Sequence, residues 1–154
     1  MTGAREGGCL CGKIRYRVEG PPNNVTNCHC RQCQMAAGAA FVTWAEFPAG
    51  AVAWPAETPA WYRSSDRAER GFCPACGTTL TFRYLEGDAL DIAAVTLDDP
   101  DALPPEDELW TASQRPWLPG DERLPRHPRE RTPGLGLAGK GRKRRVRAGS
   151  ASSG

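Results

Sequence analysis

The chain has 154 residues, of which 40% are hydrophobic and 25% charged, and its formal net charge is +2 at pH 7. This length fits one small domain, and no apolar run approaches the roughly 18 residues that a membrane-spanning helix needs. We therefore expect no association with a membrane.

The body of the chain is predicted to be mostly β-strand. Apolar and basic side chains alternate over residues 13–18, which is typical of a half-buried strand, and a Gly-, Pro- and Asn-rich loop follows at 20–24. A short strand over 25–28 precedes a helical turn over 32–37 that Gly38 ends. Further strands are predicted at 41–44, 51–54, 60–64, 78–84 and 90–95. Short strands at this spacing predict a small all-β sandwich or folded-over sheet with short helical turns.

Charge divides the chain into two parts. From Arg131 to the end there are seven basic residues and no acidic one, so the part before Arg131 is net acidic. The end is also rich in Gly, Ser and Ala and has little apolar surface to bury. We expect a domain over 1–128 and a basic tail over 129–154 that is disordered from residue 133. The tail either binds nucleic acid weakly, through phosphates and without reading sequence, or has no partner.

Seven cysteines in three tight clusters are the most informative feature of the sequence. They fall in the segments 9–12, 28–33 and 73–77, which read CLCG, CHCRQC and CPACG. Cysteines one or two residues apart direct their thiolates at one small volume, as in tetrahedral zinc sites. In the third segment, Pro and Gly favour a tight turn that points both sulfurs at one point.

Three other interpretations of the cysteines remain open. Disulfides fit poorly with an odd count, with such close spacing and with the lack of an export signal. A thioredoxin-like motif would explain Cys73 and Cys76 but not the other five. An iron–sulfur cluster is compatible with thiolates, although the long gaps between clusters are more typical of zinc.

The grouping of the cysteines also suggests chemistry. Two pairs can form a closed four-sulfur site, which is structural, whereas the central triplet supplies three ligands and leaves a fourth position open. Zinc held by three thiolates is a weak Lewis acid that activates water poorly but binds a fourth, exchangeable thiolate well. Such a thiolate can attack an aldehyde. Alternatively, His29 or another group closes the triplet and makes it structural.

Two residues inside the triplet are candidates for catalysis. The pKa of histidine lies close to neutrality, so His29 could pass a proton. The fork geometry of arginine suits a carboxylate, so Arg31 could hold a substrate, although a solvated arginine is an equally good interpretation.

The chain resembles the glutathione-dependent formaldehyde-activating enzyme (GFA) family, also called the centromere-protein-V domain family. The resemblance rests on Gly7 to Gly12, on the triplet, on Gly71 to Thr78 and on later pieces such as Asp91-Ile92 and 96–100. It implies a small zinc-stabilised folded-over sheet of the β-tent type and two zinc ions. The structural zinc would be held by Cys9, Cys11, Cys73 and Cys76, and the catalytic zinc by Cys28, Cys30 and Cys33.

The function implied by the resemblance is that of a carbon–sulfur lyase, similar to S-hydroxymethylglutathione synthase. Its substrates would be a small thiol such as glutathione and an aldehyde such as formaldehyde. Free-thiolate metal sites without an export signal predict a reducing, cytoplasmic setting. The alternatives are a non-catalytic zinc-stabilised binding module with a nucleic-acid-binding tail, and a metallochaperone or zinc-dependent protein-binding domain.

Overall fold

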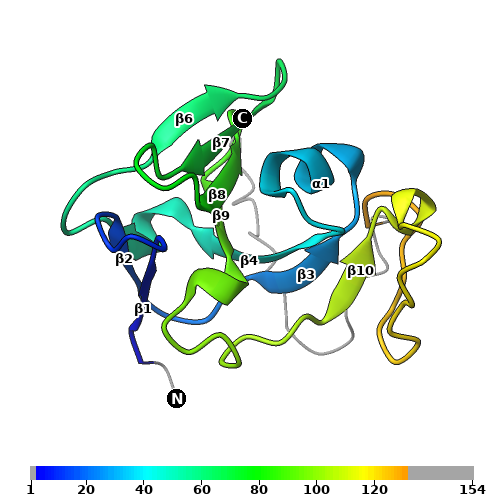
Figure 1. Ribbon diagram of the computed structural model, residues 1–154. Coiled ribbons are helices and arrows are strands. Elements are labelled where there is room, and N and C mark those ends of the chain that lie inside the picture. Colours follow the sequence, from blue (N-terminus) through cyan, green and yellow to red (C-terminus); the bar gives the residue numbers. More distant parts are fainter. Residues whose placement is uncertain (1–2, 132–154) are drawn as a thin grey trace, which may run out of the picture.

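Figure 1 shows the computed structural model of the protein, which describes residues 3–131. Its strands form two sheets, and the described residues also contain one α-helix and three short 3-10 helices. The small sheet contains, in spatial order, β1 (Arg5–Gly8), β2 (Arg15–Val18) and β5 (Val52–Ala53). The large sheet contains, in spatial order, β10 (Asp107–Leu109), β3 (Asn24–Cys28), β4 (Val42–Pro48), β9 (Ala89–Ala93), β8 (Thr79–Tyr84), β7 (Ala68–Phe72) and β6 (Ala60–Arg63). This architecture confirms the expected all-β fold.

Strand pairing is antiparallel throughout both sheets except at one edge, where β10 runs parallel to β3. In Figure 1 the small sheet and the helix lie on opposite sides of the central strands β4 and β9. The 3-10 helices are η1 (Ala49–Ala51), η2 (Ala94–Thr96) and η3 (Thr111–Ser113).

The α-helix, α1 (Arg31–Ala37), begins and ends as the sequence indicates. Cys30 is its N-cap, and the Cys30 sulfur accepts a hydrogen bond from the Cys33 N–H at 3.3 Å. Gly38 ends the helix with a φ of 61°, a left-handed conformation that costs glycine little. The cap therefore ties two cysteines of the triplet together.

The structure adds strands that the sequence did not indicate. Predicted strands are found at β2, β3, β5, β6, β8 and β9, and β4 continues to Pro48 instead of ending at Trp44. Neither β1, β7 nor β10 was predicted. β1 contains two glycines, β7 has charged residues, and β10 reads Asp-Glu-Leu, so none shows an apolar alternation.

Hydrophobic packing divides into two clusters. The larger one includes Ile14, Tyr16, Phe47 and Leu80, which are all at most 1% exposed, and it joins the two sheets. The second contains Cys28, Cys33, Val42, Trp44 and Ala93. The large sheet is thus covered on both faces, with the cysteine triplet built into the smaller cluster.

Candidate metal centres

The first candidate centre joins two turns of similar shape that follow β1 and β7. In one turn the N–H of Gly12 bonds back to the Cys9 carbonyl at 3.0 Å, and in the other Gly77 bonds to the Cys73 carbonyl at 2.8 Å. Both glycines have a φ of 78°, which side chains other than glycine rarely adopt. Together the turns bring four sulfurs within 4.8 Å of one another: Cys9, Cys11, Cys73 and Cys76.

The sulfur spacing of this cluster fits a metal and not disulfides. The Cys9 and Cys11 sulfurs are 3.5 Å apart, and those of Cys11 and Cys73 are 3.8 Å apart. A disulfide needs about 2.05 Å, whereas a tetrahedron with Zn–S bonds of about 2.3 Å has edges of about 3.8 Å. All seven cysteines are free thiols. The four residues therefore suit a closed tetrahedral ion such as zinc.

Two sulfurs of the four-cysteine cluster contact neutral polar groups. The Cys9 sulfur accepts a hydrogen bond from the Ile14 N–H at 3.3 Å, and the Cys76 sulfur lies 3.1 Å from the Thr78 hydroxyl. Cys9 is buried but Cys11 is exposed, so this cluster reaches solvent.

The second candidate centre is the triplet. Cys28 ends β3, Cys30 caps α1 and Cys33 lies in the first turn of the helix, which places their three sulfurs within 4.8 Å of one another. Cys28 and Cys33 are buried, and Cys30 is half-buried. Within residues 3–131 no histidine, carboxylate or further cysteine joins this group of ligand atoms. Its donor set suits zinc with one position left for another molecule.

The three thiols of the triplet are inequivalent. Hydrogen bonds from Cys28 and Cys33 lower the pKa of Cys30, whereas the hydrogen bond with Cys30, reinforced by Cys33 and by burial, raises the pKa of Cys28. Two buried N–H donors also point at Cys33. The Trp44 indole nitrogen lies 3.4 Å from its sulfur, and the Arg70 guanidinium 3.5 Å. Cys33 is therefore the thiol that the surrounding sheet holds most firmly.

His29 lies outside both metal clusters. Its side chain is 1% exposed, its ring packs against Phe41 at 5.3 Å between centroids, and Nε2 lies 3.5 Å from the Glu108 carboxylate. Burial lowers the pKa of His29, and neither ring nitrogen has a hydrogen-bond partner within the described chain. The His29 ring therefore lies towards Glu108 of β10 and outside the group of triplet ligand atoms.

Arg31 is placed differently. It is exposed at the start of α1, where its guanidinium donates to the Gln34 side chain at 3.1 Å. Gln34 in turn donates to the His29 carbonyl at 2.8 Å. Arg31 is thus held beside the triplet with its charge open to solvent. The catalytic roles of His29 and Arg31 stay predictions.

Sequence reasoning did not single out Asp91 as a site residue. It pairs with Glu46 on β4 and with Phe82 on β8, and residues directly opposite in a sheet share a face. The same face carries Trp44 and the triplet. Burial raises the pKa of Asp91 to about 8, helped by the negative charges of Glu46 and Cys33. Side chains alternate between the two faces of the sheet along β9, so Asp91 lies on the other face from Leu90 and Ile92. A sequence pattern cannot show that the face with Asp91 is also covered.

Two further buried acids lie in β10. Asp107 is 0% exposed and receives two hydrogen bonds from Arg131, at 2.6 and 2.8 Å. Glu108 is 3% exposed and pairs with Arg126 as well as with His29. The segment 125–131, which provides both arginines, runs along β10. The Glu108 N–H donates to the Pro125 carbonyl, and the His127 N–H donates to the Glu108 carbonyl. Residues 132–154, with most of the expected basic tail, lie outside the described residues.

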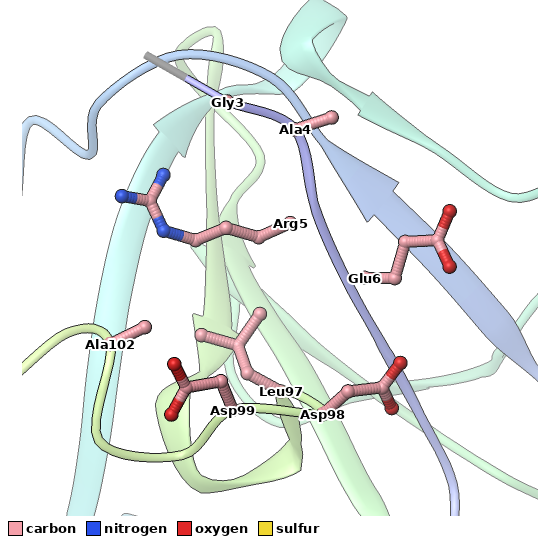
Figure 2. Close-up of a pocket in the computed structure, with 8 residues that line it drawn as sticks. All are labelled: Gly3, Ala4, Arg5, Glu6, Leu97, Asp98, Asp99 and Ala102. Carbon is pink, nitrogen blue, oxygen red and sulfur yellow. The ribbon is translucent and has the colours of Figure 1, made fainter. Parts of the chain in front are cut away.

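A cavity of about 350 Å³ lies away from both cysteine clusters. Glu6, Asp98, Asp99 and Arg5 contribute side chains to its lining, as Figure 2 shows, and none of the seven cysteines takes part. The Asp98 carboxylate is held by Arg15 at 2.9 Å. The cavity therefore adds nothing to the two metal centres.

No helix within residues 3–131 is long and apolar enough to cross a membrane. The fold and the two centres define a small β protein with cysteine clusters suited to metal ions. The sequence profile of the family described as "Glutathione-dependent formaldehyde-activating enzyme" matches residues 4–113, and the chain belongs to this family.

Two individual proteins are similar to this chain. A Schizosaccharomyces pombe protein named as an uncharacterized lyase is 35% identical over 82 residues, which make up 53% of this chain and 59% of that protein. The chain thus spans less than two thirds of that relative. A Rhodobacter sphaeroides protein of known crystal structure superposes with a TM-score of 0.51 at 18% identity, covering 61% of this chain and 88% of the other. This second likeness concerns the fold alone.

Proposed function

We propose that the protein is a carbon–sulfur lyase that joins a small thiol, glutathione in the leading case, reversibly to a small aldehyde, with formaldehyde as the first candidate. The observation that carries the proposal is the difference in ligand number between the two clusters. One has four thiols and the other three, with no further ligand from the described chain. Family membership and the lyase name of the yeast relative support the same class of reaction.

The reaction needs a thiolate and an acceptor for one proton. A zinc ion bound by Cys28, Cys30 and Cys33 would lower the pKa of a fourth, incoming thiol and hold it as a thiolate. In the forward direction the sulfur forms a bond to the carbonyl carbon, the C=O π electrons move to oxygen, and that oxygen takes up a proton. The reverse direction breaks the carbon–sulfur bond and returns the proton. No oxidant or reductant is required.

The residues beside the triplet have distinct proposed tasks. Arg31 is exposed next to Cys30, and we assign it to a carboxylate of the thiol. His29 is the proposed proton carrier. Because its ring is buried and faces Glu108, a proton would have to reach it through that carboxylate. The four-cysteine cluster holds the second zinc and supports the fold. Cysteines that hold metal without forming disulfides are typical of a reducing compartment, for which we propose the cytoplasm.

The proposal is tested by counting zinc in the purified protein and then replacing it with cobalt. We expect two ions per chain, and a new sulfur-to-cobalt charge-transfer band when glutathione is added. NMR should also show faster exchange between glutathione, formaldehyde and their adduct. Cys30→Ser is the control, since it should remove only the triplet ion. If no thiol changes the spectrum and exchange is not accelerated, the protein is not this enzyme and the non-catalytic zinc-binding module becomes the better interpretation.

A further inference from the structure

Arg70 is a buried arginine beside the triplet. It lies in β7 and is 7% exposed. Arg70 pairs with Phe82 on β8, and its guanidinium lies over that ring at 4.9 Å from the centroid. Its Nη1 donates to the Cys33 sulfur at 3.5 Å. The side chain therefore extends from the far strands of the large sheet to one ligand of the candidate metal centre.

The charge of Arg70 has no carboxylate partner among the residues that the structure describes. Within residues 3–131 no Asp or Glu oxygen lies within 4.0 Å of its guanidinium, whereas Arg83 on the adjacent strand pairs with Glu69. A guanidinium that is buried without a counter-charge is costly, and buried charges are normally paired. The polar group of the triplet that Arg70 does contact is the Cys33 sulfur. Its position is thus explained if Cys33 is a thiolate.

Trp44 supports the same sulfur from a different strand. Its indole nitrogen lies 3.4 Å from the Cys33 sulfur, and the residue is 3% exposed. Two N–H donors from β7 and β4 therefore meet at one thiol, and one of them carries a full positive charge. In the four-cysteine cluster the corresponding donors are a backbone N–H and a hydroxyl, which are neutral.

We propose that Arg70, assisted by Trp44, is a positioning residue that fixes the Cys33 thiolate and supplies the counter-charge that lets the triplet accept a second molecule's thiolate as its fourth ligand. This proposal rests on the proposed function, because it assumes that the triplet holds a divalent ion.

The charge balance of the two centres supports this role. A divalent ion with three thiolates carries a net charge of −1, and a fourth thiolate makes it −2. The four-cysteine cluster reaches the same −2, but Cys11 is exposed and water can stabilise it. The triplet is more deeply buried, so the second negative charge has to be offset from within the protein. Arg70 offsets one unit, and its hydrogen bond also withdraws electron density from Cys33 and makes the metal a better acceptor.

The test compares variants that remove the charge of Arg70, the forked geometry of its guanidinium, or the indole N–H of Trp44. Arg70→Met removes the charge at similar volume, Arg70→Lys keeps the charge without the fork, and Trp44→Phe removes only the indole donor. Arg83→Met, which deletes the surface arginine of the next strand, is the matched control. Each protein is loaded with cobalt, and its charge-transfer spectrum and its affinity for glutathione are measured without any turnover.

We expect Arg70→Met to weaken glutathione binding about tenfold or more, Arg70→Lys and Trp44→Phe by a few-fold, and Arg83→Met not at all. Fewer hydrogen bonds to a thiolate raise the energy of its lone pairs. The sulfur-to-cobalt band of Arg70→Met and Trp44→Phe should therefore shift to lower energy even before thiol is added.

An unchanged band and unchanged affinity in Arg70→Met, Arg70→Lys and Trp44→Phe would overturn the role of Arg70 while leaving the proposed function intact. Conversely, if the unmodified protein binds cobalt at the triplet but no thiol, the proposed function fails and so does the counter-charge role, whatever the band shows. If Arg70→Met does not fold, Arg70→Lys and Trp44→Phe decide the question through the same two measurements.

Discussion

The two cysteine clusters of this protein are built in different ways from the same kind of side chain. The four-cysteine cluster joins the turns after β1 and β7, which belong to different sheets, and it is therefore positioned to hold the sheets together. The triplet lies within one short stretch, from Cys28 to Cys33, and connects little that the chain does not already connect. A cluster that bridges distant segments contributes to folding, whereas a local cluster is free to serve chemistry.

The largest expected effect is on the stability of the protein, and it should differ between the two clusters. Cys73→Ser should unfold the protein or lower its melting temperature severely, because metal binding at a bridging structural site contributes directly to the free energy of folding. Cys30→Ser should leave the fold largely intact and remove one of two zinc ions. Circular dichroism melts and elemental analysis of both variants make the comparison. One ion per chain that survives Cys30→Ser with full activity would contradict the two-centre assignment.

The second effect concerns the acids of β10, beside the triplet. Arg131→Ala leaves the fully buried Asp107 without its main partner, and breaking a buried ion pair should cost about 2–4 kcal/mol. Arg123→Ala is the control: its pair with Asp121 is at the surface, with the arginine 88% exposed, so solvent screens it and its loss should change stability little. Urea denaturation measures both. Equal effects would show that segment 125–131 does not stabilise β10.

The sequence predicts the two clusters better than it predicts their surroundings. Cysteine spacing is local information, so the seven thiols and the helical turn with Gly38 could be recognised directly. Asp107 and Glu108 look like surface residues in a sequence, yet they are buried because Arg131 and Arg126 approach from about 20 residues away. Arg70 could not be assigned for the same reason: 37 residues separate it from Cys33. Contacts of this kind depend on the register of the sheet, which no local pattern specifies.

A third effect is expected on the face that holds the triplet. The pKa of Asp91 is raised to about 8 in the folded protein, above the value of about 4 in an unfolded chain. Between these values the folded state binds the extra proton, so this group's contribution to stability is present below pH 4 and is lost as the pH rises to 8. Asp91→Asn should remove that loss.

The expected gain of Asp91→Asn over the unmodified protein grows from pH 5 to pH 8 by about 1–2 kcal/mol, a value reduced because Asp91 keeps partial access to water. Urea denaturation at several pH values measures it, and the exposed Asp88→Asn serves as the control. A difference that stays constant with pH would show that Asp91 ionises normally.

A smaller effect is expected at the entrance to the triplet. Arg31→Ala should weaken thiol binding a few-fold and slow the chemical step less, since an exposed charge pair contributes little. The ratio of the effects on KM and kcat, measured with glutathione and with a thiol that lacks carboxylates, reports this. The variant should bind the neutral thiol as the unmodified protein does, and equal losses with both thiols would argue against a carboxylate contact.

The smallest effect on stability is expected from the basic end of the chain. Residues 133–154 contain few large apolar side chains, so deleting them should leave the melting temperature almost unchanged. The deletion keeps Arg131 and therefore preserves its bond to Asp107. Any affinity for nucleic acid should disappear with the segment and should fall steeply with salt, because Lys and Arg would act on phosphates alone. Fluorescence anisotropy with a labelled oligonucleotide at several salt concentrations measures this, and affinity that persists in the shortened chain would place the contact on the domain itself.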